Sequence, residues 1–168
     1  MIKDLLILTI FPGAMAVAAV TDLLTLKVPN RLVLAVAVLF FFVAPLAGLG
    51  WYAIGLHVAL AVAAFAFAFV LFSFEWMGGG DAKLFAATCL WLGPEAILAY
   101  TIYAALIGGA LALLLLFWRG LPLPVMLASR GWLARLHSPK EGVPYGIALA
   151  ASGLLVFPGT AFVGALGG

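Results

Sequence analysis

The sequence predicts an all-α membrane protein that crosses a bilayer about six times and forms one integral-membrane domain over residues 1–168. Its composition is the first reason: 67% of the residues are hydrophobic and only 8% are charged, and the mean hydropathy is +1.30. The second reason is that the apolar residues form long blocks, of about the 20 residues that a helix needs to cross a bilayer. This composition argues against a water-soluble globular domain.

The long apolar blocks predict transmembrane helices over residues 5–21, 32–49, 53–74, 82–92, 96–118 and 145–163. The first block is expected to be a retained span and not a signal peptide, because the rest of the chain is equally apolar. The fourth block is short, since about eleven helical residues cover only about half of a 30 Å hydrocarbon core. It therefore either continues through Gly93, Pro94 and Glu95 or begins below the membrane surface.

The basic residues predict the orientation of these spans. With six crossings, a single basic residue, Lys3, falls on one side of the membrane, and all the others fall on the opposite side: Lys27, Arg31, Lys83, Arg119, Arg130, Arg135 and Lys140. The side rich in Lys and Arg faces the cytoplasm in membrane proteins. We therefore expect a multi-pass membrane protein with this side in the cytoplasm and both termini outside. Residues 119–144 are either an amphipathic interfacial helix or a basic connecting loop.

Several kinds of chemistry are argued against by missing residues. The single cysteine, Cys89, leaves no disulfide within the chain and no multi-cysteine zinc site, and its apolar surroundings predict inert packing. No serine-hydrolase, zinc-peptidase or phosphate-binding motif is present. His57 falls at the external end of the third span, where we expect a packed or interfacial role. We therefore expect no metal, no cofactor and no nucleic-acid partner.

Two aspartates on the cytoplasmic side are the candidate catalytic residues. Asp22 ends the first span, where the negative end of the helix dipole disfavours a carboxylate, so helix stability does not explain it. Asp81 follows Gly78, Gly79 and Gly80 and precedes a helical run, which leaves a helix N-cap as its alternative role. A run of glycines lets a peptide backbone approach a carboxylate closely, although a simple hinge has the same composition. Two nearby carboxylates that share one proton can hydrolyse a peptide.

These segments resemble a known family. Asp22-Leu-Leu-Thr-Leu-Lys-Val-Pro-Asn-Arg-Leu is similar to the first catalytic segment of prepilin (type IV leader) peptidases, which are intramembrane aspartyl proteases of the Gly-x-Gly-Asp type. Gly-Gly-Gly-Asp81-Ala-Lys-Leu resembles their second segment, and Val-Pro-Tyr145-Gly146 resembles the start of their last helix. The resemblance implies Asp22 and Asp81 as catalytic residues. It implies a role in substrate binding or in shaping the site for the residues around them: Pro29, Asn30, Gly78, Gly79, Gly80, Lys83, Tyr145 and Gly146.

The resemblance also implies the reaction and its partners. Members remove a short basic leader from prepilin or pseudopilin precursors at the cytoplasmic face of the bacterial inner (cytoplasmic) membrane, in contact with membrane lipid and with pilus or secretion assembly machinery. Larger members carry a cysteine-rich insertion and methylate the new N-terminus. The short connection between the first two spans and the single cysteine predict that this chain lacks methyltransferase activity and is of the short tight-adherence (Flp-pilus) type.

Two other functions remain open from the residues alone. Intramembrane carboxylates also carry ions, so a small proton-coupled transporter is one alternative. A non-catalytic assembly subunit is another, in which the glycines only allow close helix packing. Replacing either aspartate with Asn distinguishes the three functions. The change abolishes cleavage by a peptidase, abolishes ion flux through a transporter and leaves an assembly subunit unchanged.

Overall fold

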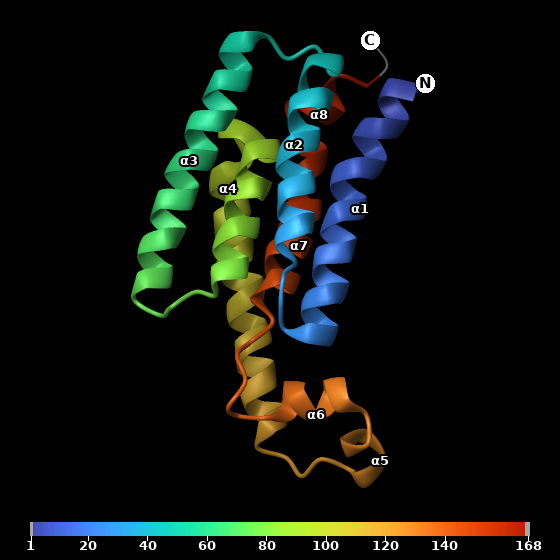
Figure 1. Ribbon diagram of the computed structural model, residues 1–168, viewed down its shortest axis with the longest axis vertical. Coiled ribbons are helices and arrows are strands. Elements are labelled where there is room, and N and C mark those ends of the chain that lie inside the picture. Colours follow the sequence, from blue (N-terminus) through green and yellow to red (C-terminus); the bar gives the residue numbers. More distant parts are fainter. Residues whose placement is uncertain (1, 167–168) are drawn as a thin grey trace.

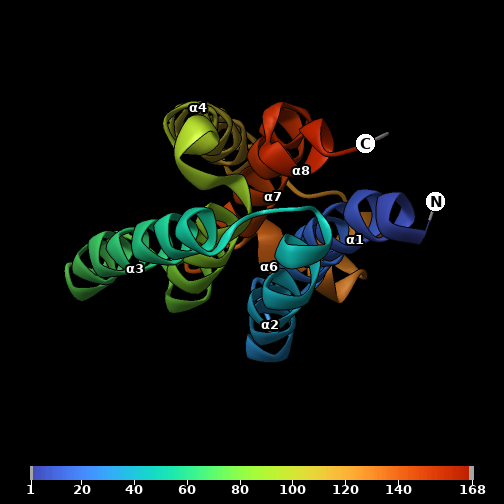
Figure 2. The same ribbon diagram turned by 90° about the horizontal axis from the view of Figure 1, so that it is seen from above.

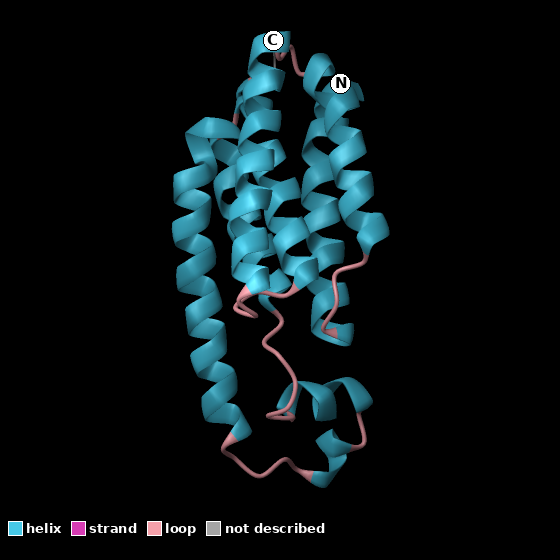
Figure 3. Cartoon of the chain, turned by 60° about the vertical axis from the view of Figure 1, so that its left-hand side comes forward, coloured by secondary structure: helices cyan, strands magenta, loops and turns pink. Residues whose placement is uncertain are grey.

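The computed structural model describes residues 2–166, and every regular element within them is helical (Figures 1 and 3). This confirms the predicted all-α class. Lys3 donates a hydrogen bond to the carbonyl of Ala165, and both ends of the chain lie at the same end of the bundle (Figure 1). The elements are α1 (Ile2–Thr25), α2 (Asn30–Leu46), α3 (Trp51–Ser73), α4 (Gly79–Arg119), α5 (Val125–Ala128), α6 (Gly131–His137), α7 (Tyr145–Val156), the 3₁₀ helix η1 (Phe157–Gly159) and α8 (Ala161–Gly164).

The long helix α4 consists of two legs that run in opposite directions. Gly93 separates them with φ 70° and ψ −175°, a conformation that is essentially restricted to glycine. In Figure 1 the first leg rises beside α3, and the second descends past the bundle toward α5. The two legs correspond to the predicted fourth and fifth spans, which the sequence placed on either side of the same glycine.

The number of crossings stays a prediction. Within the described residues, four helical segments have the length and hydropathy of a membrane span, and α2, with 17 residues, is a shorter apolar helix. The four are Ile2–Thr25, Trp51–Ser73, Gly79–Arg119 and Tyr145–Gly164. Six crossings follow if α2 spans the bilayer and if each leg of α4 crosses it separately.

Helix α7 lies near the centre of the bundle, with α1, α2, α3 and α4 around it (Figure 2). Its small residues allow this close packing. A Cβ atom placed on Gly153 would lie 3.1 Å from Cγ2 of Thr88 and 3.4 Å from Cζ of Phe11. The approach of α1 and α4 to α7 therefore depends on glycine at this position.

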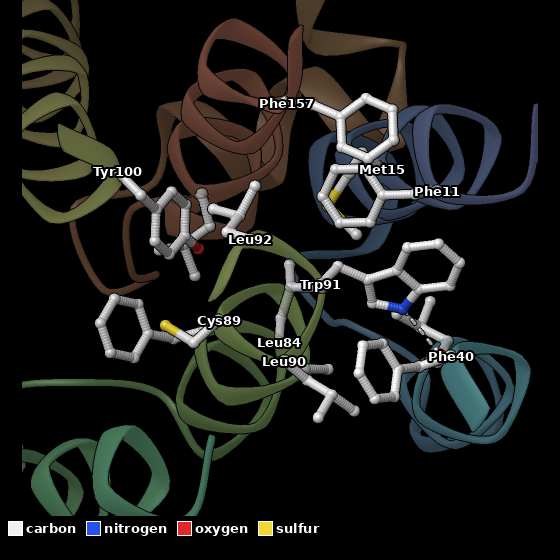
Figure 4. Close-up of a cluster of buried hydrophobic side chains, with 14 of the residues drawn as sticks. Phe11, Met15, Phe40, Leu84, Cys89, Leu90, Trp91, Leu92, Tyr100 and Phe157 are labelled. Carbon is white, nitrogen blue, oxygen red and sulfur yellow. Dashed lines mark hydrogen bonds between the residues drawn. The ribbon is translucent and has the colours of Figure 1, made fainter. Parts of the chain in front are cut away.

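Aromatic side chains fill the core between the helices (Figure 4). Phe11 stacks on Trp91 and on Phe157, with ring centroids 5.5 and 4.7 Å apart. Trp91 is fully buried, and its indole Nε1 donates a hydrogen bond to the carbonyl of Val36 at 2.9 Å. Cys89 is fully buried as well, which agrees with the inert packing role predicted for it.

Residues 119–144 contain two short helices, α5 and α6, and no continuous interfacial helix. Arginine side chains hold this segment against the bundle. Arg119 donates to the carbonyls of Leu136 and Gly142, both at 2.9 Å, and Arg135 donates to the carbonyl of Leu24 at 2.8 Å. The segment is thus fastened beneath the ends of α1 and α4.

His57 occupies the point where α4 reverses. Pro94 has no N–H group, so the carbonyl of Leu90 lacks its usual helical donor. His57 is only 3% exposed, and its Nδ1 lies 2.8 Å from this carbonyl oxygen. The imidazole also fills the space beside Gly93, where a Cβ atom would lie 2.5 Å from Cε1 of His57. The packed role predicted for His57 is confirmed.

We predict that His57→Leu destabilises the protein by about 1–3 kcal/mol, because it leaves the buried Leu90 carbonyl without a donor. His57→Gln keeps an N–H donor and should lose clearly less stability. Thermal unfolding in detergent measures both variants. Equal melting temperatures for His57→Leu and the parent protein would contradict the role assigned to this hydrogen bond.

Candidate active site

Asp22 lies in the last turn of α1, one turn before the helix ends at Thr25. The backbone N–H of Leu26 closes the helix by donating to the Asp22 carbonyl at 2.8 Å, and Leu26 itself adopts φ 54°. The side chain of Asp22 is 3% exposed, so the carboxylate points into the protein. Its Oδ2 atom has no hydrogen-bond partner among the described residues.

The N-terminus of α7 faces this carboxylate. The backbone N–H groups of Gly146 and Ile147 interact with it, and the positive end of the α7 dipole lies beside the carboxylate. A Cβ atom on Gly146 would lie 2.8 Å from Oδ2 of Asp22 and 3.0 Å from Cγ2 of Val28. Glycine at position 146 therefore makes the space that the carboxylate occupies, and α7 offsets the unfavourable position of Asp22 at the end of α1.

Asp81 lies in the first turn of α4. The N-cap of this helix is Gly78, with φ −68° and ψ 144°, so the alternative interpretation of Asp81 as the N-cap is wrong. Its carboxylate bends back over the cap: a Cβ atom on Gly78 would lie 2.8 Å from Oδ2 of Asp81. The carboxylate of Asp81 thus packs against Gly78, as that of Asp22 packs against Gly146.

The glycines before Asp81 leave room that side chains would fill, and they do not adopt backbone angles that only glycine allows. Among the described residues, the glycines with positive φ are Gly48 and Gly93. A Cβ atom on Gly79 would lie 3.3 Å from the ring of Phe72, and one on Gly80 would lie 3.4 Å from Val28. The left-handed residue in the connection to this helix is Glu75, with φ 60°, and not one of the three glycines.

Asp22 and Asp81 line the same cavity, of about 320 Å³, at the end of the bundle near α5 and α6. Residues 23–80 separate them in the sequence, and the fold brings them together. Most of the other predicted site residues of the first two segments share this cavity. Its complete lining is Asp22, Leu26, Lys27, Val28, Asn30, Gly78, Gly79, Gly80, Asp81 and Val143.

The remaining predicted site residues surround this cavity. Pro29 is exposed and forms the N-cap of α2. Lys83 donates a hydrogen bond to Oδ1 of Asn30 at 3.1 Å, and so links α4 to the start of α2. Tyr145 packs its ring against Gly108 and donates from its hydroxyl to the carbonyl of Ala104 at 3.1 Å. The family resemblance predicted these residues as site residues, but the sequence did not predict their contacts.

Residues 2–166 contain no group of three or more His, Cys, Asp or Glu side chains arranged to hold a metal ion. The polar groups in the smaller cavity are two carboxylates, one amide and one lysine, together with backbone groups. Such a set suits acid–base chemistry, in which one carboxylate accepts a proton while the other donates one.

A family model described as the type IV leader peptidase family matches residues 9–113. The chain belongs to the type IV leader peptidase family. Asp22 and Asp81 lie within the matched residues, whereas Tyr145 and Gly146 lie beyond them. Family membership and the long apolar helices together indicate a membrane protein.

A curated relative supports the same assignment. The prepilin leader peptidase/N-methyltransferase of Bacillus subtilis (strain 168) is 29% identical over 158 residues, which cover 88% of this chain and 53% of the relative. The chain thus spans about half the length of this leader peptidase. No solved structure matches the chain.

We predict that Gly78→Ala lowers peptidase activity on a prepilin precursor by about tenfold or more, because its methyl group displaces the Asp81 carboxylate and misplacing a reacting group is costly. The backbone angles at position 78 suit alanine, so the melting temperature should change little. Gly109→Ala in the second leg of α4 is the matched control, since its methyl group would meet nothing within 4 Å and position 109 lines neither cavity at the aspartates. Equal activities for the two variants would contradict the role assigned to Gly78.

Proposed function

We propose that this chain is an aspartyl endopeptidase that removes the short basic leader from type IV prepilin or pseudopilin precursors. One observation supports this most strongly: Asp22 and Asp81 line a single cavity at the end of the bundle that also carries α5 and α6. Family membership supplies the reaction class. The proposed site is therefore a pair of carboxylates near the membrane surface.

The proposed mechanism requires one ionised and one protonated carboxylate in the pair. The ionised group takes a proton from a water molecule, and the water oxygen attacks the scissile carbonyl carbon. The protonated group donates its proton to the carbonyl oxygen, which gives a neutral tetrahedral intermediate. When this collapses, the C–N bond breaks, the leaving nitrogen takes the proton that the first carboxylate accepted from water, and a hydroxyl of the intermediate returns its proton to the second carboxylate, which restores the one-proton state of the pair. No metal or cofactor enters these steps.

The glycines around the pair give the substrate access in this proposal. An extended peptide must bring its carbonyl within about 3 Å of a water held between the carboxylates. Gly78, Gly79 and Gly80 present backbone without side chains on the wall of the same cavity. The hydrogen bond between Lys83 and Asn30 connects the two segments that carry the aspartates, and so holds their spacing.

We propose that this site faces the cytoplasm at the inner membrane. The end of the bundle with α5 and α6 carries seven of the eight basic residues, and Lys3 lies at the opposite end beside Ala165. Positive charge accumulates on the cytoplasmic side of membrane proteins. In this position the enzyme meets precursors, membrane lipid and the pilus or secretion machinery that uses the processed product.

We also propose that the chain does not methylate the product and is of the short tight-adherence type. The connection between α1 and α2 consists of residues 26–29 only, and the chain has one cysteine. Neither feature leaves a place for the cysteine-rich insertion of larger members. Incubation with a precursor and S-adenosylmethionine should give a product whose mass shows cleavage without an added methyl group.

We predict that Asp22→Asn and Asp81→Asn each lower cleavage by about a thousandfold or more, because neither carboxylate replaces the other in a shared-proton pair. Asn has nearly the same shape as Asp, so expression and melting temperature should stay close to those of the parent. Mass spectrometry of a digested precursor measures the rate and the position of the cut. Turnover by either variant above about a tenth of the parent rate would sink the assignment.

We predict that cleavage survives metal chelators. The proposed pair activates water by proton transfer, which needs no Lewis acid. Rates measured after dialysis against a chelator, with and without added divalent ions, provide the test. Activity that disappears in the chelator and returns with a divalent ion would rule out the metal-free mechanism.

A further inference from the structure

A second and larger cavity, of about 970 Å³, adjoins the one between the two aspartates. Both cavities are lined by Leu26, Gly78, Asp81 and Val143, so they meet at Asp81. The walls of the larger cavity come from the end of α3, the α3–α4 connection, both legs of α4 and the segment before α7. A peptide that reaches the aspartates therefore has room to continue into this larger cavity.

The larger cavity is acidic, although it lies at the basic end of the molecule. Its lining includes Glu75, Asp81 and Glu141 and contains no lysine or arginine. The chain has six acidic residues, of which Asp4 and Glu95 lie toward the opposite end. The other four all line one of the two adjoining cavities. Negative charge at this end is thus gathered where a ligand would lie.

In the adjoining smaller cavity, the buried carboxylate of Asp22 is a further sign that a ligand binds at this end of the bundle. It is 3% exposed, it lines the adjoining cavity, and its Oδ2 has no partner among the described residues. A buried polar atom of this kind normally has a partner. A metal ion does not suit the acidic cavity, because the side chains of residues 2–166 form no metal-binding cluster.

The lining of the larger cavity suits a guanidinium or ammonium group carried on a peptide. Phe72 and Trp76 line the same cavity as the two glutamates, and aromatic rings attract cations through their faces. Hydrogen bonds hold both loops in place. The N–H of Glu75 donates to the carbonyl of Phe72 at 2.9 Å, and Arg119 donates to the carbonyl of Gly142, the residue after Glu141, at 2.9 Å.

We propose that Glu75 and Glu141 bind the cationic residues of the substrate in this larger cavity, which we name the acidic vestibule (the cavity lined by Glu75, Asp81 and Glu141). This proposal rests on the proposed function, since it places the cationic segment next to a bond cleaved at Asp22 and Asp81. Glu75 and Glu141 are specificity-determining residues and take no part in the proton transfers. The vestibule selects positive charge on a face of the protein that otherwise repels it.

Kinetic constants for charge variants of enzyme and peptide test the proposal. We expect the double variant Glu75→Gln with Glu141→Gln to raise KM for a Lys- and Arg-containing precursor peptide by about tenfold, the effect of losing two weak ion pairs together. Its kcat should change by less than about twofold. For a peptide with Gln in place of those basic residues, parent and double variant should have equal KM. Added salt should reduce the difference. Glu95→Gln, an exposed acidic residue elsewhere, is the matched control and should behave as the parent.

Charge reversal gives the sharper result. Glu75→Lys with Glu141→Lys should prefer a peptide with Glu in place of its basic residues, reversing the parent's order. If the double Gln variant discriminates between basic and neutral peptides as strongly as the parent, or if Glu95→Gln weakens binding equally, the proposal is overturned.

Binding separates this proposal from the proposed function. Fluorescence anisotropy of a labelled basic peptide is measured on Asp22→Asn, with and without the two Gln changes. A Kd raised about tenfold by the Gln changes supports the vestibule even if the parent protein cleaves no precursor. An unchanged Kd overturns the vestibule even if cleavage by Asp22 and Asp81 is established.

Discussion

The close packing of α7 against α1 and α4 is the constraint on which the site depends. Gly146 and Gly153 make this packing possible, because a Cβ atom at either position would meet side chains of the neighbouring helices at 2.8 to 3.4 Å. The packing places the N-terminus of α7 against Asp22, so the positive end of one helix dipole meets a carboxylate at the negative end of another. A larger side chain at position 146 would separate these two helix ends and open the cavity between the aspartates.

The reversal of α4 at Gly93 determines how deep Asp81 lies. Residues 79–92 form the first leg, and at about 1.5 Å per residue they extend only about 21 Å, less than a hydrocarbon core of about 30 Å. If Gly93 lies at the outer surface, Asp81 begins below the inner one. Pro94 and His57 stabilise this reversal, since the imidazole binds the carbonyl that proline leaves without a donor. A structural histidine far from the aspartates thus helps to set their position.

Charge is separated within one end of the molecule. Seven of the eight basic residues lie at the end of the bundle with α5 and α6, and of these only Lys27 lines one of the two adjoining cavities. All four acidic residues of that end line these cavities. The same arrangement serves two purposes in our proposals, since one pair of carboxylates performs the chemistry and the two glutamates select positive charge. Arg119 connects both regions, because its guanidinium holds the loop that carries Glu141.

The sequence by itself determined the helical class, the positions of the apolar segments, the reversal near Gly93 and the two segments that carry Asp22 and Asp81. These features are encoded locally, in hydropathy, in glycine and proline, and in short motifs. Only the tertiary structure decided that Gly78 and not Asp81 caps α4, that Lys83 binds Asn30, that His57 serves the Leu90 carbonyl, and that Glu75 and Glu141 share a cavity. Each of these depends on contacts between residues distant in the chain or on the residue at which a helix begins, and a single sequence contains no periodicity or motif that reports such details.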